Sequence, residues 1–288
     1  MNNRTIIPFL SAGVLFLSFF LSGCDKVDAP FTQNNGGGGG GGTGDVKRTI
    51  LVEEFTGFKC KNCPDASKSL HLLKENQYED QLILVAVHAG TLAQPNIAGN
   101  YSSADYRTTE GTQLAADFQV DYVPVGLINR VPDGGSSTPF YEKEIWASVI
   151  ATELEKPVEA DVKLSATYNA ATRLVNIAVD GKFLVDGTDK EYLSVFVIED
   201  QVIGEQDSNG FHIEHFHHKS MFRGTVNGLY GEKILDTAIP KDYTFTKNYT
   251  YTLPAAINPA KCHLVAFIHR KDVGISTVRQ AAELILLP

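Results

Sequence analysis

Basic residues are scarce in this sequence of 288 residues. It holds 25 lysines and arginines against 34 aspartates and glutamates, which gives a formal net charge of −9 at pH 7. The basic residues do not gather in any one stretch of the chain. A protein that binds nucleic acid or anionic lipid headgroups needs a basic patch to meet the phosphates. The composition therefore argues against both kinds of partner.

The sequence also lacks a convincing transmembrane helix. Its candidate, residues 6–21, lies close to the N-terminus, and Arg4 is the only charge before it. A helix that spans a bilayer needs about 20 apolar residues, so this segment is typical of a cleaved signal peptide instead. It ends in Leu21-Ser22-Gly23-Cys24, which resembles the lipobox of bacterial lipoproteins. In that motif the cysteine is acylated and becomes the first residue of the mature chain.

The lipobox predicts that residues 1–23 are removed and that a lipid on Cys24 attaches the chain to a membrane. The alternative is an ordinary secretory peptide cut near Gly23. Both export the chain to an oxidising compartment, where paired thiols persist as disulfides. Cleavage removes one arginine and no acid, so the net charge changes from −9 to −10. Membrane attachment must then come from the lipid.

Residues 24–45 are predicted to form a flexible tether, because they are rich in Asn, Thr and Gly and include an unbroken run of glycine over 36–42. Such a segment buries no apolar surface. With about 20 residues, its typical end-to-end distance is on the order of 25 Å. The remaining chain is long enough for two domains. Its pattern changes near Pro157, so we expect one domain at 46–157 and another at 158–288.

In the first of these domains, residues 50–55 and 82–87 form apolar runs typical of parallel strands that are covered on both faces. Between them an amphipathic helix is indicated by Ala66, Leu70 and Leu73. This order predicts a βαβ unit. An insertion, a short helix, a strand led by a proline and a closing helix are expected at 90–111, 113–118, 122–128 and 145–154.

Cys60 and Cys63 stand at the junction between the first strand and the helix, where thioredoxin-like folds carry a redox pair. The positive end of the helix dipole stabilises a thiolate on the first cysteine. Cys60, next to Lys59, is therefore predicted to be the attacking thiol, and Cys63 to resolve the mixed disulfide. The alternative is an inert local disulfide.

The order of motifs in this domain resembles thioredoxin. Glu-Phe is followed after four residues by Cys-x-x-Cys, and then come a helix, a strand, a short helix and Val-Pro. The resemblance implies a cis proline facing the pair, which Pro124 matches. It also implies a buried acid six residues before the first cysteine, which Glu54 matches and which would accept a proton from Cys63. Glu54 could instead be solvated. Two departures are Lys59 in place of the usual tryptophan, and Pro64, which the first turn of a helix tolerates.

The second domain is predicted to be an all-β immunoglobulin-like sandwich following the α/β thioredoxin-like domain. Alternating strands are indicated at 160–168, 174–184, 192–203, 243–253 and 262–269, separated by turn signals. Cys262 begins one of these strands and has no obvious partner. We expect it to behave as a buried, small apolar residue.

A histidine cluster is the one unusual feature of this domain, with members His212, His215, His217 and His218. On a strand, His215 and His217 would share a face and could approach a metal ion. No carboxylate-rich segment accompanies them, so we interpret the cluster as a connecting loop. A structural zinc site would need four ligands, and the only other thiols of the mature chain are Cys262 and Cys24, which the lipobox predicts to be acylated. We therefore expect neither a metal nor another cofactor.

Five motifs carry a family resemblance: the lipobox, Cys-x-x-Cys-Pro, Val-Pro, and the stretches His-Lys-Ser-Met-Phe-Arg (218–223) and Asn-Gly-Leu-Tyr-Gly-Glu (227–232). With them the chain resembles lipoproteins related to a 28-kilodalton outer membrane protein of Bacteroidetes-type bacteria. The resemblance spans the mature chain. It implies a cell-envelope protein that is lipid-anchored in the outer membrane.

Two functions follow from these features. The first is a thiol–disulfide oxidoreductase acting on exported proteins, favoured by Lys59, Pro124 and Glu54. The second is a non-catalytic surface lipoprotein that binds a partner and keeps the pair as a structural disulfide. The long insertion after His88 and the missing tryptophan favour this second function.

Overall fold

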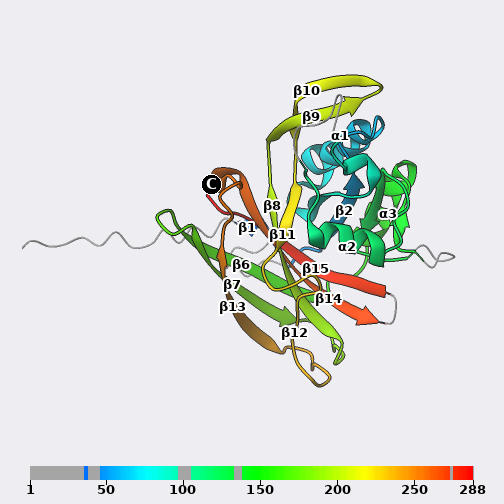
Figure 1. Cartoon of the computed structure of the whole chain (residues 1–288). Coiled ribbons are helices and arrows are strands. Elements are labelled where there is room, and N and C mark those ends of the chain that lie inside the picture. The colour runs from blue at the N-terminus through cyan, green and yellow to red at the C-terminus, as the bar shows by residue number, and fades with distance from the viewer. Residues whose placement is uncertain (1–35, 38–45, 97–104, 133–137, 273–274, 288) are drawn as a thin grey trace, which may run out of the picture. The chain divides into compact units, whose positions relative to one another are not determined.

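The computed structural model describes residues 36–37, 46–96, 105–132, 138–272 and 275–287. The predicted signal peptide, Cys24 and most of the predicted tether lie outside these ranges. The chain from Thr32 to Pro288 forms one compact unit. The described chain is mostly β-sheet with few helices, as Figure 1 shows.

The predicted pair of parallel strands is confirmed. Strands β2 (Ile50–Thr56) and β3 (Leu82–His88) pair in parallel, and helix α1 (Cys63–Leu73) connects them. Two short helical turns, η1 (Lys74–Tyr78) and η2 (Glu79–Gln81), follow α1. Every residue of both strands is buried, which explains their unbroken apolar runs. Their few polar residues are therefore buried as well.

The rest of the first half contains η3 (Thr91–Ala93), α2 (Thr109–Asp117), β4 (Val125–Ile128), β5 (Phe140–Tyr141), η4 (Lys143–Ile145) and α3 (Trp146–Leu154). Helix α2 begins four residues before the predicted start. The reason is a cap: the side chain of Thr108 accepts a hydrogen bond from the backbone N–H of Gly111 at 2.9 Å. Strand β4 begins directly after Pro124 and pairs antiparallel with β2.

The second half is built of strands. They are β6 (Ala160–Asn169), β7 (Leu174–Phe183), β8 (Glu191–Glu199), β9 (Val202–Ser208), β10 (Phe211–His218), β11 (Met221–Thr225), β12 (Glu232–Lys233), β13 (Thr244–Thr252), β14 (Cys262–Asp272) and β15 (Ile275–Ile285), with the turn η5 (Pro259–Lys261) before β14. The interpretation of the histidine cluster as a loop is wrong. These residues form β10, which pairs with β9 in a hairpin that is bulged between Ile213 and Phe216.

One large sheet takes strands from both halves of the chain. Its order is β1-β15-β14-β8-β11-β3-β2-β4-β5, with β12 beside β8 and with β1 (Gly36–Gly37) at one edge. The halves join where β11 pairs with β3 in parallel, and the N–H of Ala86 donates to the carbonyl of Ser220 at 2.7 Å. A separate sheet has the order β13-β7-β6. The domain limits at 46–157 and 158–288 stay a prediction.

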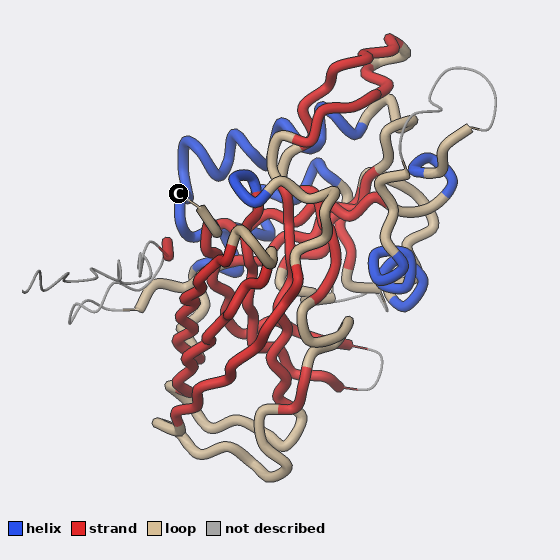
Figure 2. Tube along the Cα trace, turned by 60° about the vertical axis from the view of Figure 1, so that its left-hand side comes forward, coloured by secondary structure: helices blue, strands red, loops and turns tan. Residues whose placement is uncertain are grey.

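Three apolar clusters hold these elements together. One joins β6, β7 and β13 to the large sheet, a second lies between α2 and the large sheet, and a third packs α1 and α3 on the opposite face of β2 and β3. Figure 2 shows the helices gathered toward one end of the strands. Successive residues of β2 therefore face different clusters, and this alternation positions the two glutamates of that strand on opposite faces.

Candidate functional site

The two cysteines of the Cys-x-x-Cys motif are joined by a disulfide. Their Cα atoms are 5.4 Å apart, and α1 begins at Cys63 itself. Cys63 is therefore the first residue of the helix, and Cys60 precedes it. Pro64 has no N–H to donate and occupies the first helical turn, where none is needed, so it is compatible with a helix that begins at Cys63.

The disulfide lies next to a cis proline. The Val123–Pro124 peptide bond is cis, as predicted, and the Sγ of Cys60 lies 3.8 Å from the carbonyl oxygen of Val123. Lys59 is turned toward the insertion, where its Nζ donates to Oδ1 of Asn96 at 3.2 Å. Cys60 is 3% exposed and Cys63 1%, so the surrounding chain covers both sulfurs.

Glu54 is buried behind the disulfide. It lies on the face of β2 that α1 covers, it is 4% exposed, and its Oε1 has no hydrogen-bond partner among the described residues. Burial raises its pKa to about 8, and a hydrogen bond from Ser67 acts in the opposite direction. The alternative that this glutamate is solvated is wrong. The carboxyl group is neutral at pH 7 and able to donate or accept a proton near that pH.

The hairpin β9–β10 holds the loop that carries Cys60. The backbone N–H of Asp207 donates to the carbonyl of Phe58 at 2.7 Å, and that of Asn209 to the carbonyl of Lys61 at 2.9 Å. The side-chain amide of Gln206 donates to the carbonyl of Cys60 at 3.2 Å. Figure 1 shows the hairpin standing beside α1. Gln206 was missed in the sequence, because nothing in its local pattern shows that it folds back onto residues about 150 positions earlier.

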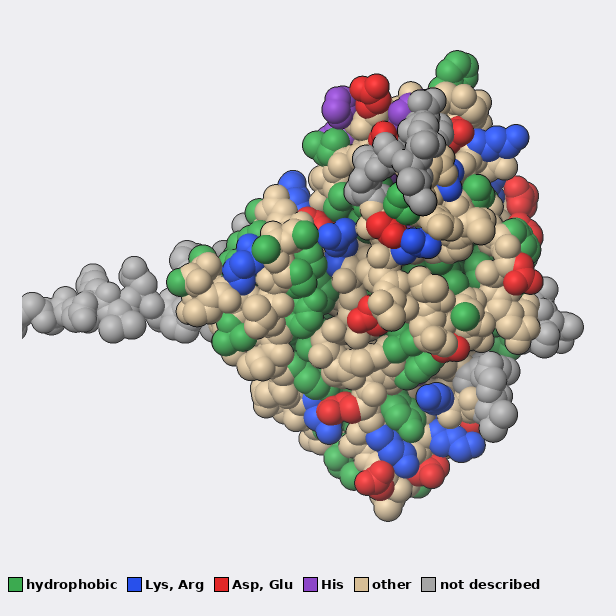
Figure 3. Space-filling model, in the orientation of Figure 1, with side chains coloured by type: hydrophobic (Ala, Val, Ile, Leu, Met, Phe, Trp, Pro, Cys, Tyr) green, Lys and Arg blue, Asp and Glu red, His purple; other side chains and the backbone are tan. Residues whose placement is uncertain are grey.

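The histidines of the hairpin do not act as one group. His218 is buried, and its Nε2 lies 3.2 Å from the carbonyl of Glu205. His217 contacts Gln201, and His212 lies near Glu205. Figure 3 shows histidine and acidic side chains together at the end of the molecule where the hairpin stands. Within the described ranges, no group of three or more His, Cys, Asp or Glu side chains is placed to hold a metal ion.

His88 is a further residue that the sequence did not single out. It is 3% exposed at the end of β3, its Nδ1 has no hydrogen-bond partner in the described part of the chain, and its ring centroid lies 5.2 Å from that of His218. Burial lowers the pKa of His88 well below its ordinary value and that of His218 to about 4. Both imidazoles are therefore neutral at pH 7.

A cavity of about 470 Å³ opens beside these groups. Glu54, Cys63 and His88 lie along it, and its walls come from α1 and from the hairpin. Two buried polar atoms without partners, Oε1 of Glu54 and Nδ1 of His88, thus belong to residues of the same cavity. Such atoms are rare in folded proteins and mark a place where water or a ligand is expected.

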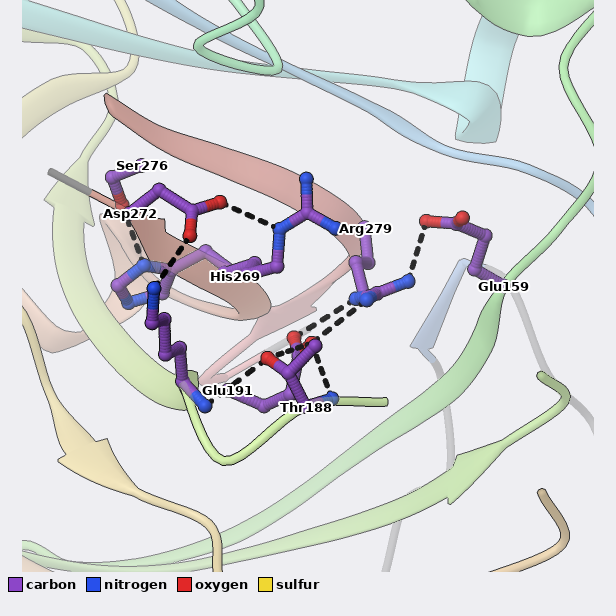
Figure 4. Close-up of polar contacts among 9 residues, drawn as sticks. Glu159, Thr188, Glu191, His269, Asp272, Ser276 and Arg279 are labelled. Carbon is purple, nitrogen blue, oxygen red and sulfur yellow. Dashed lines mark hydrogen bonds and ion pairs between the residues drawn. The ribbon is translucent and has the colours of Figure 1, made fainter. Parts of the chain in front are cut away.

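A second polar cluster lies in the large sheet and is structural (Figure 4). Arg279 donates to both carboxylate oxygens of Glu191 at 2.8 and 2.7 Å and lies 2.9 Å from Glu159. Nearby, His269 lies between two serines, with Ser194 at 2.9 Å and Ser276 at 2.6 Å. A serine beside a histidine suggests a hydrolase, but Ser194 and His269 are 0% exposed, so no substrate reaches them.

Comparison with protein families shows that residues 111–283 match the family described as outer membrane protein Omp28. The match covers more than half of the chain, and the chain therefore belongs to the Omp28 family. This membership confirms the predicted location in the cell envelope at the outer membrane. In the described part of the chain, no helix is both long and apolar enough to cross a membrane.

Solved structures give a fold relationship. The chain is similar to HBP35 of Porphyromonas gingivalis, with a TM-score of 0.67 and 17% identity over 84% of this chain and 76% of that one. It also matches a domain of the outer membrane lipoprotein Omp28 from Porphyromonas gingivalis at 18% identity, over 46% of this chain and 92% of that one, with a TM-score of 0.29. Comparison with curated proteins gives no match.

Proposed function

We propose that this chain is a lipid-anchored outer-membrane lipoprotein whose Cys60–Cys63 pair carries out thiol–disulfide exchange. The observation that carries the proposal is the placement of the disulfide between the carbonyl of Val123 and the cavity that Glu54 lines. In this proposal residues 46–157 form a thioredoxin-like domain and residues 158–288 an immunoglobulin-like sandwich. Cys24 carries the lipid.

The exchange assigns a role to each group. In the reduced protein the Cys60 thiolate attacks a disulfide of an exported protein, and one sulfur of that disulfide leaves. Cys63 then attacks the sulfur of Cys60, which releases the reduced substrate and restores the Cys60–Cys63 bond. Glu54 exchanges a proton with Cys63 during this step. Lys59 favours the thiolate form of Cys60 through its charge.

A second candidate function is partner binding at the surface, with the pair as a structural disulfide. The observation that favours it is the burial of both sulfurs, at 3% and 1% exposure, beneath the hairpin. A disulfide that is covered in this way exchanges slowly. In this alternative the sandwich or the surface near Pro124 holds the partner.

The reduction potential of the pair separates the two functions. A structural disulfide has a potential below about −300 mV, whereas pairs that exchange in the envelope lie well above that value. Equilibration of the oxidised full chain with redox buffers, read by alkylation and mass spectrometry, gives the potential. For an exchanging pair, Cys63→Ser should accumulate mixed disulfides with protein substrates, while Cys60→Ser should abolish the exchange with them. A potential below about −300 mV would favour partner binding.

A further inference from the structure

A buried glutamine of the hairpin, Gln206, contacts the backbone of the cysteine loop, which comprises residues 57–61. The side chain of Gln206 is 2% exposed, and its Nε2 lies 3.2 Å from the carbonyl oxygen of Cys60 and 3.4 Å from that of Gly57. The same amide group donates to the carbonyl of Asp207 in its own strand at 2.8 Å. The second half of the chain thus supplies a hydrogen-bond donor to the residue that forms the disulfide.

The two carbonyls that Gln206 contacts also order the turn between the cysteines. The carbonyl of Cys60 accepts the backbone N–H of Cys63 at 3.2 Å, and the carbonyl of Gly57 accepts the N–H of Cys60 at 2.9 Å. This turn sets the separation of the cysteines, whose Cα atoms are 5.4 Å apart. Gln206 therefore stabilises the backbone conformation in which the disulfide is formed.

The backbone of the hairpin holds the same loop on both sides of Cys60. The N–H groups of Asp207 and Asn209 donate to the carbonyls of Phe58 and Lys61 at 2.7 and 2.9 Å. With Gln206 included, the hairpin contacts the carbonyls of residues 57, 58, 60 and 61. Movement of the loop away from its present position would break these hydrogen bonds.

Reduction of the pair requires such a movement. The two sulfurs of the dithiol are no longer bonded, and unbonded atoms lie farther apart than bonded ones. Cys63 is 1% exposed and is fixed as the first residue of α1, so the displacement falls on Cys60 and its loop. Contacts that hold Cys60 in its present position therefore stabilise the disulfide relative to the dithiol.

We propose that Gln206 is a positioning residue for the Cys60–Cys63 pair, which holds Cys60 in the disulfide-bonded position and so lowers the reduction potential of the pair. The inference rests on the exchange proposed above, in which the dithiol passes two electrons and two protons to a substrate disulfide and the Cys60–Cys63 bond re-forms. It adds that the second half of the chain sets the potential of this step. Coupling between two sites is reciprocal, so reduction of the pair weakens the contacts between hairpin and loop.

The redox equilibrium tests the role of Gln206. The full chain is equilibrated with glutathione or dithiothreitol redox buffers, and the two forms are counted by alkylation and mass spectrometry. Gln206→Met keeps the length of the side chain and removes its N–H donors. The equilibrium should shift about tenfold toward the dithiol, which corresponds to a rise of about 30 mV in the potential.

Gln280→Met is the matched control for this variant. Gln280 is likewise buried, at 3% exposure, and donates to a distant backbone carbonyl, that of Lys47 at 2.8 Å, but it lies in β15. This substitution should lower the thermal stability and leave the potential unchanged. Equal shifts in the two variants, or an unchanged potential in Gln206→Met, would overturn the inference.

Hydrogen exchange of the wild-type chain gives a second measurement that needs no variant. The amides of Asp207 and Asn209 donate to the loop, so they should exchange faster in the reduced protein than in the oxidised protein. The amides of β14, which pairs with β8 and β15, should exchange equally in both forms. Equal exchange of the hairpin amides in the two forms would show that hairpin and pair are not coupled, against the inference.

These results are distinguishable from a failure of the proposed exchange. A wild-type potential in the range of structural disulfides would argue against the exchange, while the difference between Gln206→Met and Gln280→Met would still decide the role of Gln206. A wild-type potential in the exchanging range, with no shift in Gln206→Met, would leave the exchange standing and remove the positioning role.

Discussion

Glu53 and Arg130 form a fully buried ion pair, in which Nε and Nη2 of the arginine each donate to a carboxylate oxygen at 2.6 Å. The two side chains are 1% and 0% exposed. The guanidinium carbon lies 5.1 Å from the ring centroids of both Phe118 and Phe267. The planar group is thus held by two hydrogen bonds to Glu53, by a longer one to Oγ of Ser276 at 3.5 Å and by two aromatic faces.

Removal of one partner of this pair should destabilise the fold strongly. In Arg130→Met, Glu53 keeps a buried charge without compensation, and we expect a loss of about 3–5 kcal/mol in the free energy of unfolding. Urea denaturation followed by circular dichroism measures the change. The double variant Glu53→Leu with Arg130→Met removes both charges and should recover much of the loss. Equal stability of the single and double variants would show that the charge is not the cause.

Glu54, the next residue along β2, has no ion-pair partner within the described ranges, and we expect it to make stability depend on pH. Its pKa is raised to about 8 in the folded protein from an ordinary value of 4.5. Between these values the folded state holds a proton that the unfolded state has lost, so stability falls as pH rises toward 8 and is flat above it. The slope for one proton is about 1.4 kcal/mol per pH unit.

The difference between the wild type and Glu54→Gln isolates this effect, because the buried histidines, whose folded pKa values lie below 6.5, change the stability of both proteins alike. Glu54→Gln cannot ionise, so the stability of the wild type should fall relative to that of this variant as pH rises toward 8. As pH falls below 6.5 the buried histidines destabilise both proteins, since the unfolded histidines take up protons that the folded ones do not, while the contribution of Glu54 to the wild type keeps rising down to about pH 4.5. A wild-type protein with the same pH profile as Glu54→Gln would contradict the raised pKa.

The contrast between these two glutamates shows which buried residues can be predicted from the sequence and which cannot. The motif around Cys60 singled out Glu54, because its distance along the chain fits a known pattern. Glu53 carries no such signal, since its partner Arg130 is 77 residues away and is brought to it when β4 pairs with β2. The hairpin β9–β10 was missed for the same reason. Its contacts with the cysteine loop are long-range, and its histidines mask the alternation expected of a strand. Local runs such as those of β2 and β3 were predicted well because burial alone decides them.

Attachment to the membrane through Cys24 is testable by fractionation. Cys24 lies outside the described residues, and the prediction depends on the lipobox. Cys24→Ala should move the protein from the membrane fraction to the soluble fraction, because lipid supplies the only membrane affinity that we expect. Its thermal unfolding should match that of the wild-type folded region. A variant that remains with the membranes after a high-salt wash would contradict the lipid anchor.

The third cysteine in the described chain, Cys262, should be unreactive in the native protein. It is free, 0% exposed at the start of β14, and burial raises its thiol pKa to about 12. Thiol reagents attack the thiolate, which is scarce at neutral pH and out of reach here. The oxidised native protein should therefore take up no label. After denaturation without a reductant it should take up one label, and Cys262→Ala should take up none. Rapid labelling of the native protein would mean that β14 opens or that the disulfide is reduced, and mass spectrometry of the labelled peptide would tell these two apart.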